Sequence, residues 1–231
     1  MLRIPTLILF DLDGTLVDTA TEIAAAVNRT LQEERLPVCS QPSITNWIGK
    51  GTAWLFGNAL QEVTGDSAIR TSDLYARSYP RFLDNYAEGT GQLSTLYPHT
   101  REALRQLAAA GVRLGVVTNK ERSLTLRLLD AHHLTDAFEI LVAGGDTAQG
   151  KPSPDPLFLA LQKAGVNADD CLFVGDSQND VEAARNAGIK VWAFNHGYNH
   201  GEPIALAHPD AVIEGFTELL ERLDSPQARS A

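Results

Sequence analysis

Residues 10–18 read Phe10-Asp11-Leu12-Asp13-Gly14-Thr15-Leu16-Val17-Asp18 and directly follow the apolar run Thr6-Leu7-Ile8-Leu9. An apolar run of this length is typical of a strand that is buried on both faces. Two carboxylates two residues apart would share one face of a continuing strand. Gly14 allows a sharp turn after them, because glycine has no Cβ atom. The pattern predicts two acids in one crevice beyond the carboxyl end of a strand, where open α/β sheets bind ligands.

Two buried like charges cost free energy unless a cation neutralises them, and crowded carboxylate oxygens suit Mg²⁺ bound together with a phosphate. Further polar groups follow three later predicted strands. They are Thr118 and Asn119 after residues 112–117, Lys151 in the loop after residues 138–142, and Asp176 and Asp180 after residues 171–174. The carboxyl ends of parallel strands lie at one edge of a sheet, so we expect these groups to meet Asp11 and Asp13 there.

Strand-like and helix-like segments alternate from residue 98 onward. The predicted strands, with helices between them, cover residues 112–117, 138–142, 171–174, 190–194 and 211–213, and a last helix covers residues 216–223. This alternation is the sign of βαβ units, so it predicts an α/β fold with a Rossmann-like, doubly wound parallel sheet. Residues 225–231 lack apolar side chains and are predicted to form a frayed tail.

The segment between the first strand and this alternating pattern is helical in character. Residues 20–35 and about 43–93 contain no strand-like run. They predict a small all-helical cap domain over residues 19–95, inserted into a core domain of residues 1–18 and 96–231. In the cap, Trp47-Ile48-Gly49-Lys50-Gly51 places a lysine between two glycines, where Lys50 could contact an anionic ligand. A plain turn with a solvated lysine fits this stretch equally well.

Charge and composition limit the partners of the 231-residue chain. Its 29 acidic and 19 basic residues give a net charge of -10, so neither nucleic acid nor an anionic membrane is an expected partner. No apolar run approaches the roughly 20 residues of a membrane span. The first residues run directly into a core strand without a signal-peptide pattern, and Cys39 and Cys171 have no metal-type spacing. We therefore expect free thiols and a cytoplasmic location. For the assembly state we expect a monomer or a homodimer.

The polar groups at the predicted strand ends each have a use in phosphoryl transfer. One carboxylate can attack phosphorus to form a covalent intermediate, and a second can protonate the leaving oxygen and then activate water. Further carboxylates can hold Mg²⁺. A hydroxyl, a backbone N–H and a lysine can bind the phosphoryl oxygens as negative charge builds on them.

The four motifs, in this order, resemble those of the haloacid dehalogenase-like hydrolase superfamily. The resemblance implies that Asp11 is the nucleophile and Asp13 the general acid and base, with the backbone carbonyl of Asp13 also reaching the metal. It further implies phosphate binding by Thr118, beside Asn119, and by Lys151. Asp176 and Asp180 would hold Mg²⁺ directly or through water.

Asp13 narrows the expected reaction, because dehalogenases and phosphonoacetaldehyde hydrolases of this superfamily lack a carboxylate at that position. The leaving alkoxide of a phosphate ester needs a proton, so Asp13 favours a phosphatase or a phosphomutase. Residues 11–19, Trp47 to Gly51 and Gly197-Tyr198-Asn199 resemble bacterial phosphoglycolate phosphatases, which implies 2-phosphoglycolate as the small phosphorylated metabolite. Selection of that substrate would then fall to the cap through Lys50.

Three other functions remain open at this point. A β-phosphoglucomutase-like phosphomutase would share the helical cap, although such relatives usually differ after the Asp-Gly pair. A broad-specificity sugar phosphatase is the second, because members of the family often accept several small phosphate esters. A non-catalytic phosphate-binding module is the third, although the intact set of Asp11, Asp13, Lys151 and Asp176 argues against it.

Overall fold

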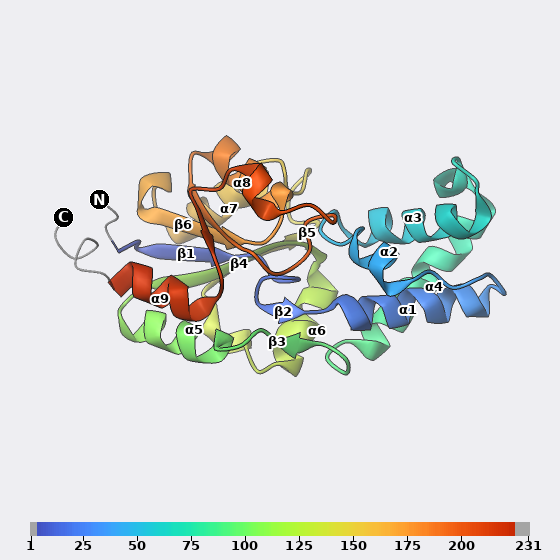
Figure 1. The fold of residues 1–231 in the computed structure, drawn as a ribbon, viewed down its shortest axis with the longest axis horizontal. Helices are drawn as coiled ribbons and strands as arrows, with labels where there is room; N and C mark the ends of the chain where they lie inside the picture. The colour runs from blue at the N-terminus through green and yellow to red at the C-terminus, as the bar shows by residue number, and fades with distance from the viewer. Residues whose placement is uncertain (1–3, 225–231) are drawn as a thin grey trace.

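The structure is a computed structural model and describes residues 4–224, so the predicted frayed tail lies outside the described residues. Within residues 4–224, six parallel strands form the main sheet in the order β5-β4-β1-β6-β7-β8 (Figure 1). The strands are β1 (Leu7–Phe10), β4 (Arg113–Glu121), β5 (Ile140–Gly144), β6 (Cys171–Gly175), β7 (Lys190–Phe194) and β8 (Ala211–Ile213). This arrangement confirms the α/β fold that the sequence predicted.

The strand order reverses direction at β1. Phe10 lies beside Val116 of β4 on one side and beside Val174 of β6 on the other. The chain passes outward through β4 and β5, then returns to build β6, β7 and β8 on the opposite side of β1. Such a reversal leaves a crevice outside the carboxyl ends of the adjacent strands. The residues that follow β1, β4 and β6 therefore share one space.

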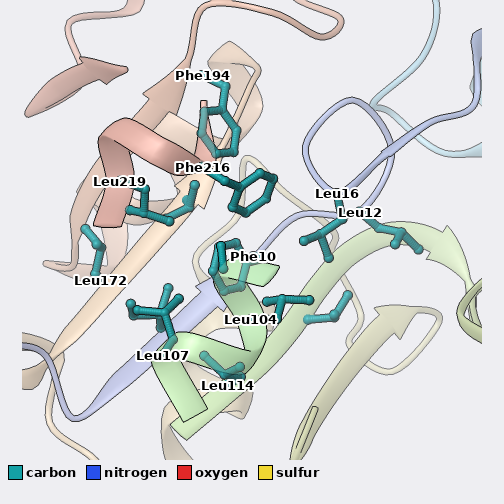
Figure 2. Close-up of a cluster of buried hydrophobic side chains, with 14 of the residues drawn as sticks. Phe10, Leu12, Leu16, Leu104, Leu107, Leu114, Leu172, Phe194, Phe216 and Leu219 are labelled. Carbon is teal, nitrogen blue, oxygen red and sulfur yellow. The ribbon is translucent and has the colours of Figure 1, made fainter. Parts of the chain in front are cut away.

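Helices cover both faces of the sheet. One face is covered by α5 (Thr100–Ala109), α6 (Arg122–Ala131) and α9 (Phe216–Asp224), and the other by α7 (Asp155–Ala164) and α8 (Gln178–Ala187). Successive strand residues point to opposite faces, so Ile8 and Phe10 join the first cluster and Leu7 and Leu9 the second. Figure 2 shows Phe10 packed with Leu104, Leu107 and Phe216 in the first cluster. Burial on both faces explains why β1 is apolar without alternation.

A separate group of helices, which we call the helical unit, lies at one end of the molecule (Figure 1). It consists of α1 (Ala20–Glu33), α2 (Gln41–Thr45), α3 (Thr52–Thr64) and α4 (Asp73–Gly89), with its own hydrophobic cluster. In that cluster the rings of Phe56 and Phe82 stack with their centroids 4.8 Å apart. Single turns of 3-10 helix occur at Ile69–Thr71, Thr135–Ala137, Ala168–Asp170 and Ile204–Ala207.

The helical unit joins the sheet through a two-stranded antiparallel connection that the sequence did not predict. It pairs β2 (Val17–Asp18) with β3 (Thr95–Leu96). Strands of two residues are too short for a periodic pattern to indicate them. The proposed division into a core of residues 1–18 and 96–231 and a cap of residues 19–95 has its boundary at this pair.

Three further details bear on the sequence predictions. β4 continues past its predicted end to Glu121, with an irregular register after Val117, so Thr118 and Asn119 belong to the strand end. Cys39 and Cys171 are buried free thiols, as predicted. Among the described residues, no helix combines the length and the apolar composition needed to cross a bilayer.

Candidate active site

Asp11 directly follows β1 and is only 6% exposed. Its backbone N–H donates to the carbonyl of Val174 in β6 at 2.9 Å, which fixes it over the gap between the two strands. One carboxylate oxygen, Oδ1, lies 2.8 Å from Nζ of Lys151. Burial raises the pKa of Asp11 to about 7; Lys151 opposes this shift, and the charge of Asp180 adds to it. Asp11 is thus a buried carboxylate held against one cation.

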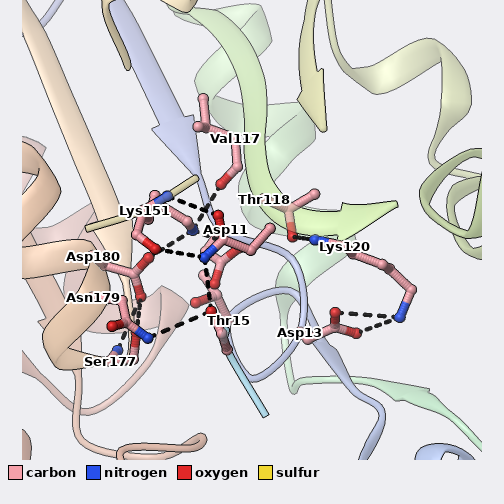
Figure 3. A network of polar contacts seen from close by, with 12 residues as sticks. Asp11, Asp13, Thr15, Val117, Thr118, Lys120, Lys151, Ser177, Asn179 and Asp180 are labelled. Carbon is pink, nitrogen blue, oxygen red and sulfur yellow. Dashed lines mark hydrogen bonds and ion pairs between the residues drawn. The ribbon is translucent and has the colours of Figure 1, made fainter. Parts of the chain in front are cut away.

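Lys151 lies in the loop before α7 and is held by three partners (Figure 3). Besides Asp11, its ammonium lies 2.7 Å from Oδ1 of Asp180 and donates to the carbonyl of Val117 at 2.9 Å. The ammonium therefore donates two hydrogen bonds and forms an ion pair with Asp11. Burial alone would lower the pKa of Lys151, but the charges of Asp11 and Asp180 outweigh burial and raise it. The lysine therefore stays charged beside Asp11.

Asp13 faces the same crevice as Asp11, but its carboxylate pairs with a different lysine. The backbone turns after β1, where the carbonyl of Leu12 accepts the N–H of Leu16 at 3.0 Å, so strand alternation no longer applies. The Asp13 carboxylate accepts from Lys120 at 2.9 and 3.2 Å and from the Thr19 hydroxyl at 2.8 Å. Each acid of the motif therefore has its own lysine (Figure 3).

The turn after Asp13 depends on glycine. Gly14 has a φ of 87°, a region that side chains with a Cβ rarely adopt. A Cβ atom at this position would also collide with the carboxylate of Asp176. The glycine therefore allows the first motif to approach the loop after β6.

That approach gathers three buried acids, Asp11, Asp176 and Asp180. Each contributes a carboxylate oxygen to a group whose atoms lie within 4.8 Å of one another. Burial raises the pKa of Asp176 well above its usual value, and the charges of Asp180 and Asp11 raise it further. The predicted strand-end acids are therefore brought together, apart from the Asp13 side chain.

The carboxylates of Asp176 and Asp180 are also held by protein donors. Asp176 accepts from the Thr15 hydroxyl at 2.5 Å and from the backbone N–H of Tyr198 at 2.6 Å. Oδ2 of Asp180 accepts from the Ser177 backbone N–H at 3.0 Å and from its hydroxyl at 2.8 Å, as part of the capping box that begins α8. Asp180 therefore also orients the start of α8 and, through Oδ1, Lys151.

The acidic group fits a magnesium ion by the chemistry of its donors. Its oxygens are hard ligands of the kind that Mg²⁺ prefers. Three carboxylates stand against the one ammonium of Lys151, so two negative charges lack a compensating cation when all three acids are ionised. Such a buried excess is unfavourable without a divalent cation. Asp11, Asp176 and Asp180 are thus the residues that could hold Mg²⁺.

Thr118 and Asn119, both predicted to bind phosphate, have different surroundings. Thr118 is 4% exposed and lines the crevice with its hydroxyl next to the N–H of Lys120, at 3.2 Å. The amide of Asn119 donates to the carbonyls of Gly49 and Lys151, both at 2.8 Å, and accepts the Lys151 N–H at 2.8 Å. Its side chain therefore joins the end of β4 to two loops, and a phosphate contact from this residue would fall to its backbone.

A cavity of about 30 Å³ lies between the sheet edge and the helical unit, room for one or two water molecules. The core contributes Asp11, Asp13, Thr118, Asn119 and Lys120 to its wall. The helical unit contributes Ile23, Ile48, Gly49, Gly51, Thr52, Leu55, Phe82 and Tyr86. The candidate site is thus a narrow space with a polar floor and a largely apolar roof.

Lys50 does not line this cavity, although its neighbours Gly49 and Gly51 do. Its side chain is exposed, and its ammonium lies 5.4 Å from the ring centroid of Trp54. The glycine loop reaches the core as expected, but it does so with the carbonyl of Gly49, which faces Asn119. The structure therefore does not bring the predicted specificity lysine into the site.

Sequence reasoning missed Lys120, Thr15 and Tyr198. Lys120 is 4% exposed, pairs with Asp13 and lines the cavity. It directly follows Thr118 and Asn119, so its place at the end of the same strand was the available signal. Tyr198 stood in the quoted stretch 197–199, but nothing in that stretch indicated its contact with Asp176. Thr15 lies within the first motif, where no pattern indicated its partner.

Comparisons with known proteins agree with this geometry. Residues 8–194 match the haloacid dehalogenase-like hydrolase family. A phosphoglycolate phosphatase of Yersinia pestis is 38% identical over 95% of this chain and 94% of its own length. One of Vibrio parahaemolyticus is 38% identical over 93% of this chain and 94% of its own length.

A solved structure has the same architecture. A crystal structure described as a predicted phosphoglycolate phosphatase from Haemophilus somnus superposes with a TM-score of 0.92 at 33% identity. The match covers 97% of this chain and 100% of that one. These likenesses confirm the resemblance noted in the sequence motifs, and the chain belongs to the haloacid dehalogenase-like hydrolases.

Proposed function

We propose that this chain is a Mg²⁺-dependent phosphatase that hydrolyses 2-phosphoglycolate through an aspartyl-phosphate intermediate on Asp11. The observation that supports it most is the separation of the two acids of the first motif. Asp11 lies with Lys151 in the acidic group, and Asp13 is held apart by Lys120. One carboxylate can therefore act as nucleophile while the other exchanges protons. The names of the relatives support the substrate.

In the first step, an oxygen of Asp11 forms a bond to phosphorus as the bond from phosphorus to the bridging oxygen breaks. Protonated Asp13 gives its proton to that oxygen, so glycolate leaves as an alcohol. Lys151 and the hydroxyl of Thr118 are the groups proposed to bind the phosphoryl oxygens. Both are buried, where a charge or a dipole stabilises the transition state more than it would in water.

In the second step, Asp13 takes a proton from a water molecule whose oxygen bonds to phosphorus. The bond between phosphorus and Asp11 breaks, which releases phosphate and returns Asp13 to its protonated form. Asp11, Asp176 and Asp180 are the proposed metal residues, together with the backbone carbonyl of Asp13 that the family resemblance implies. When bound, Mg²⁺ would offset the negative charge that the phosphate brings to these acids.

The walls of the cavity bear on the choice of substrate. The volume of about 30 Å³ is too small for a hexose phosphate and for 2-phosphoglycolate alike, so any ester would enter only after the helical unit moves away from the sheet. The apolar roof, with Ile23, Ile48 and Leu55, offers few partners for sugar hydroxyls, which favours a small leaving group.

Two measurements test this function. Release of phosphate from 2-phosphoglycolate, glucose 6-phosphate, β-glucose 1-phosphate and p-nitrophenyl phosphate, with Mg²⁺ and with excess chelator, tests the substrate and the metal. We expect the highest kcat/KM for 2-phosphoglycolate and none after chelation. Acid quenching with radiolabelled substrate should leave label on the wild-type protein and none on Asp11→Asn. Preferred turnover of a sugar phosphate, or conversion of β-glucose 1-phosphate into glucose 6-phosphate, would instead support the alternatives.

The location and the assembly state remain predictions from the sequence. We propose a cytoplasmic protein that is a monomer or a homodimer. Cell fractionation and size-exclusion chromatography with light scattering would test these two points.

A further inference from the structure

Lys120 is a buried cation at the core side of the cavity. Its side chain is 2% exposed, and its ammonium lies 2.9 Å from Oδ1 of Asp13. Among the described residues that line the cavity, it is the one cationic side chain. Lys151, the other buried lysine of the site, does not line this cavity and contacts Val117, Asp11 and Asp180. An anionic group that enters the cavity therefore meets the ammonium of Lys120, which also pairs with Asp13.

Tyr86 of α4 meets Lys120 from the helical unit. The tyrosine is 1% exposed and lines the same cavity. Its hydroxyl oxygen accepts a hydrogen bond from the Lys120 ammonium, which also lies 4.4 Å from the centroid of the tyrosine ring. Burial raises the pKa of Tyr86 well above its usual value, so the hydroxyl keeps its proton. Among the described residues, none accepts a hydrogen bond from the Tyr86 hydroxyl. The pair thus presents an ammonium and a hydroxyl to one space.

The substrate's own geometry relates this pair to the leaving group. Asp13 must reach the bridging oxygen of the ester in order to protonate it. In 2-phosphoglycolate the carboxylate carbon is two covalent bonds from that oxygen. A cation that touches Asp13 is therefore within reach of this carboxylate. Its negative charge would otherwise enter a buried space already occupied by Asp13 and the phosphate, and an unpaired buried charge is strongly unfavourable.

We propose that Lys120 and Tyr86 form the subsite that binds the carboxylate of the leaving group. This inference rests on the proposed function, since it requires a substrate with a carboxylate close to its ester oxygen. In the closed structure Lys120 pairs with Asp13, and a bound carboxylate shares this ammonium. Recognition is then divided between a lysine of the core and a tyrosine of the helical unit. It is complete only when the helical unit lies against the core, as it does in this structure.

The test compares two esters that differ in charge at this point. The first is 2-phosphoglycolate, and the second is 2-hydroxyethyl phosphate, in which a neutral CH₂OH group replaces the carboxylate. The measured quantity is the ratio of kcat/KM for the two substrates. We expect Lys120→Met to lower this ratio by roughly 10- to 150-fold, the range for the loss of one charge-assisted hydrogen bond. Lys120→Arg should keep more of the preference than Lys120→Met.

A control and a second variant make the result specific. Lys50→Met removes the same charge from an exposed lysine outside the cavity and is the matched comparison. Tyr86→Phe removes only the hydroxyl, so it tests the subsite even if Lys120→Met does not fold. We expect it to lower the ratio by a few-fold, as for one neutral hydrogen bond. Circular dichroism and thermal melting confirm that each variant is folded.

Several outcomes would overturn the inference. Equal losses on both esters would mean that Lys120 acts through Asp13 alone, and an unchanged ratio would remove it from recognition. A selective loss in Lys50→Met, but not in Lys120→Met, would return the role to Lys50. If the wild-type protein shows no preference for 2-phosphoglycolate over 2-hydroxyethyl phosphate, the proposed function itself fails. A wild-type preference that survives in both Lys120→Met and Tyr86→Phe overturns only the subsite.

Discussion

The hydroxyl of Tyr198 donates a hydrogen bond of 2.5 Å to Oδ1 of Asp18, across 180 positions of sequence. The hydroxyl oxygen of Tyr198 also accepts hydrogen bonds from the backbone N–H groups of Thr19 at 2.8 Å and Ala20 at 2.9 Å, at the start of α1. The backbone N–H of Tyr198 donates to Asp176 in the acidic group. One residue therefore links the connection to the helical unit with the candidate metal site.

Tyr198→Phe should destabilise the protein while leaving Asp176 in place. The change removes three hydrogen bonds and leaves the buried N–H of Thr19 without an acceptor, which costs about 1–3 kcal/mol. Urea denaturation measures the loss in the free energy of unfolding. Tyr75→Phe is the control, because its hydroxyl makes one long, exposed hydrogen bond of 3.3 Å to Ala53. A loss no larger than that of Tyr75→Phe would show that the link contributes nothing.

Asp11→Asn should abolish turnover and leave the protein folded. An amide cannot form the aspartyl-phosphate, and loss of a covalent nucleophile typically lowers kcat by more than about a thousandfold. The variant keeps the size of the side chain and one oxygen near Lys151. Phosphate release and circular dichroism check the two halves of this prediction. Turnover near the wild-type rate would remove Asp11 from the nucleophile role.

The stabilisation that Mg²⁺ gives should grow with pH. Burial raises the pKa of Asp11 from 3.8 to about 7, so in this window the folded protein holds a proton that the unfolded chain has lost. The contribution of Asp11 to the free energy of unfolding of the metal-free protein therefore falls as pH rises through the window. Mg²⁺ binding requires Asp11 to lose that proton. At higher pH a smaller fraction of the folded protein carries the proton, so its release opposes binding less.

Melting temperatures with chelator and with Mg²⁺, measured near pH 5 and near pH 8, check this sign. We expect the larger rise on adding Mg²⁺ near pH 8, where binding needs no proton release from Asp11. Asp11→Asn should weaken the dependence on pH. An equal or larger rise near pH 5 would contradict the assignment of this group to the metal.

Asn119→Ala should lower the turnover of every phosphate ester by a similar factor. The side chain holds the Lys151 backbone and the Gly49 carbonyl, so its loss would loosen both the proposed phosphate-binding lysine and the contact of the helical unit with the core. We expect kcat/KM to fall about 10- to 100-fold on both 2-phosphoglycolate and p-nitrophenyl phosphate. Asn58→Ala, at a half-buried amide of α3 that bonds Arg70 and lies outside the cavity, is the matched control. A loss confined to one ester would show that Asn119 contacts the leaving group.

The sequence by itself determined the parallel sheet and most of the acids at its edge. The predicted strands at residues 171–174 and 190–194 match β6 and β7 to within one residue, because a buried strand must be apolar along its whole length. Asp11, Asp176 and Asp180 could be placed together for a similar reason. In a parallel sheet the carboxyl ends of all strands lie at one edge, so the position of an acid along the chain fixes its position in the fold.

Only the tertiary structure decided which charge pairs with which. Asp13 meets Lys120 across 107 positions, and Lys50 lies over Trp54, outside the cavity that its glycine neighbours line. The pairing of β2 with β3, each two residues long, was equally hidden. Hydrophobic periodicity reports whether a segment is buried, and that is a local property. The partner of a buried charge depends on how turns and distant elements meet, which only the folded chain establishes.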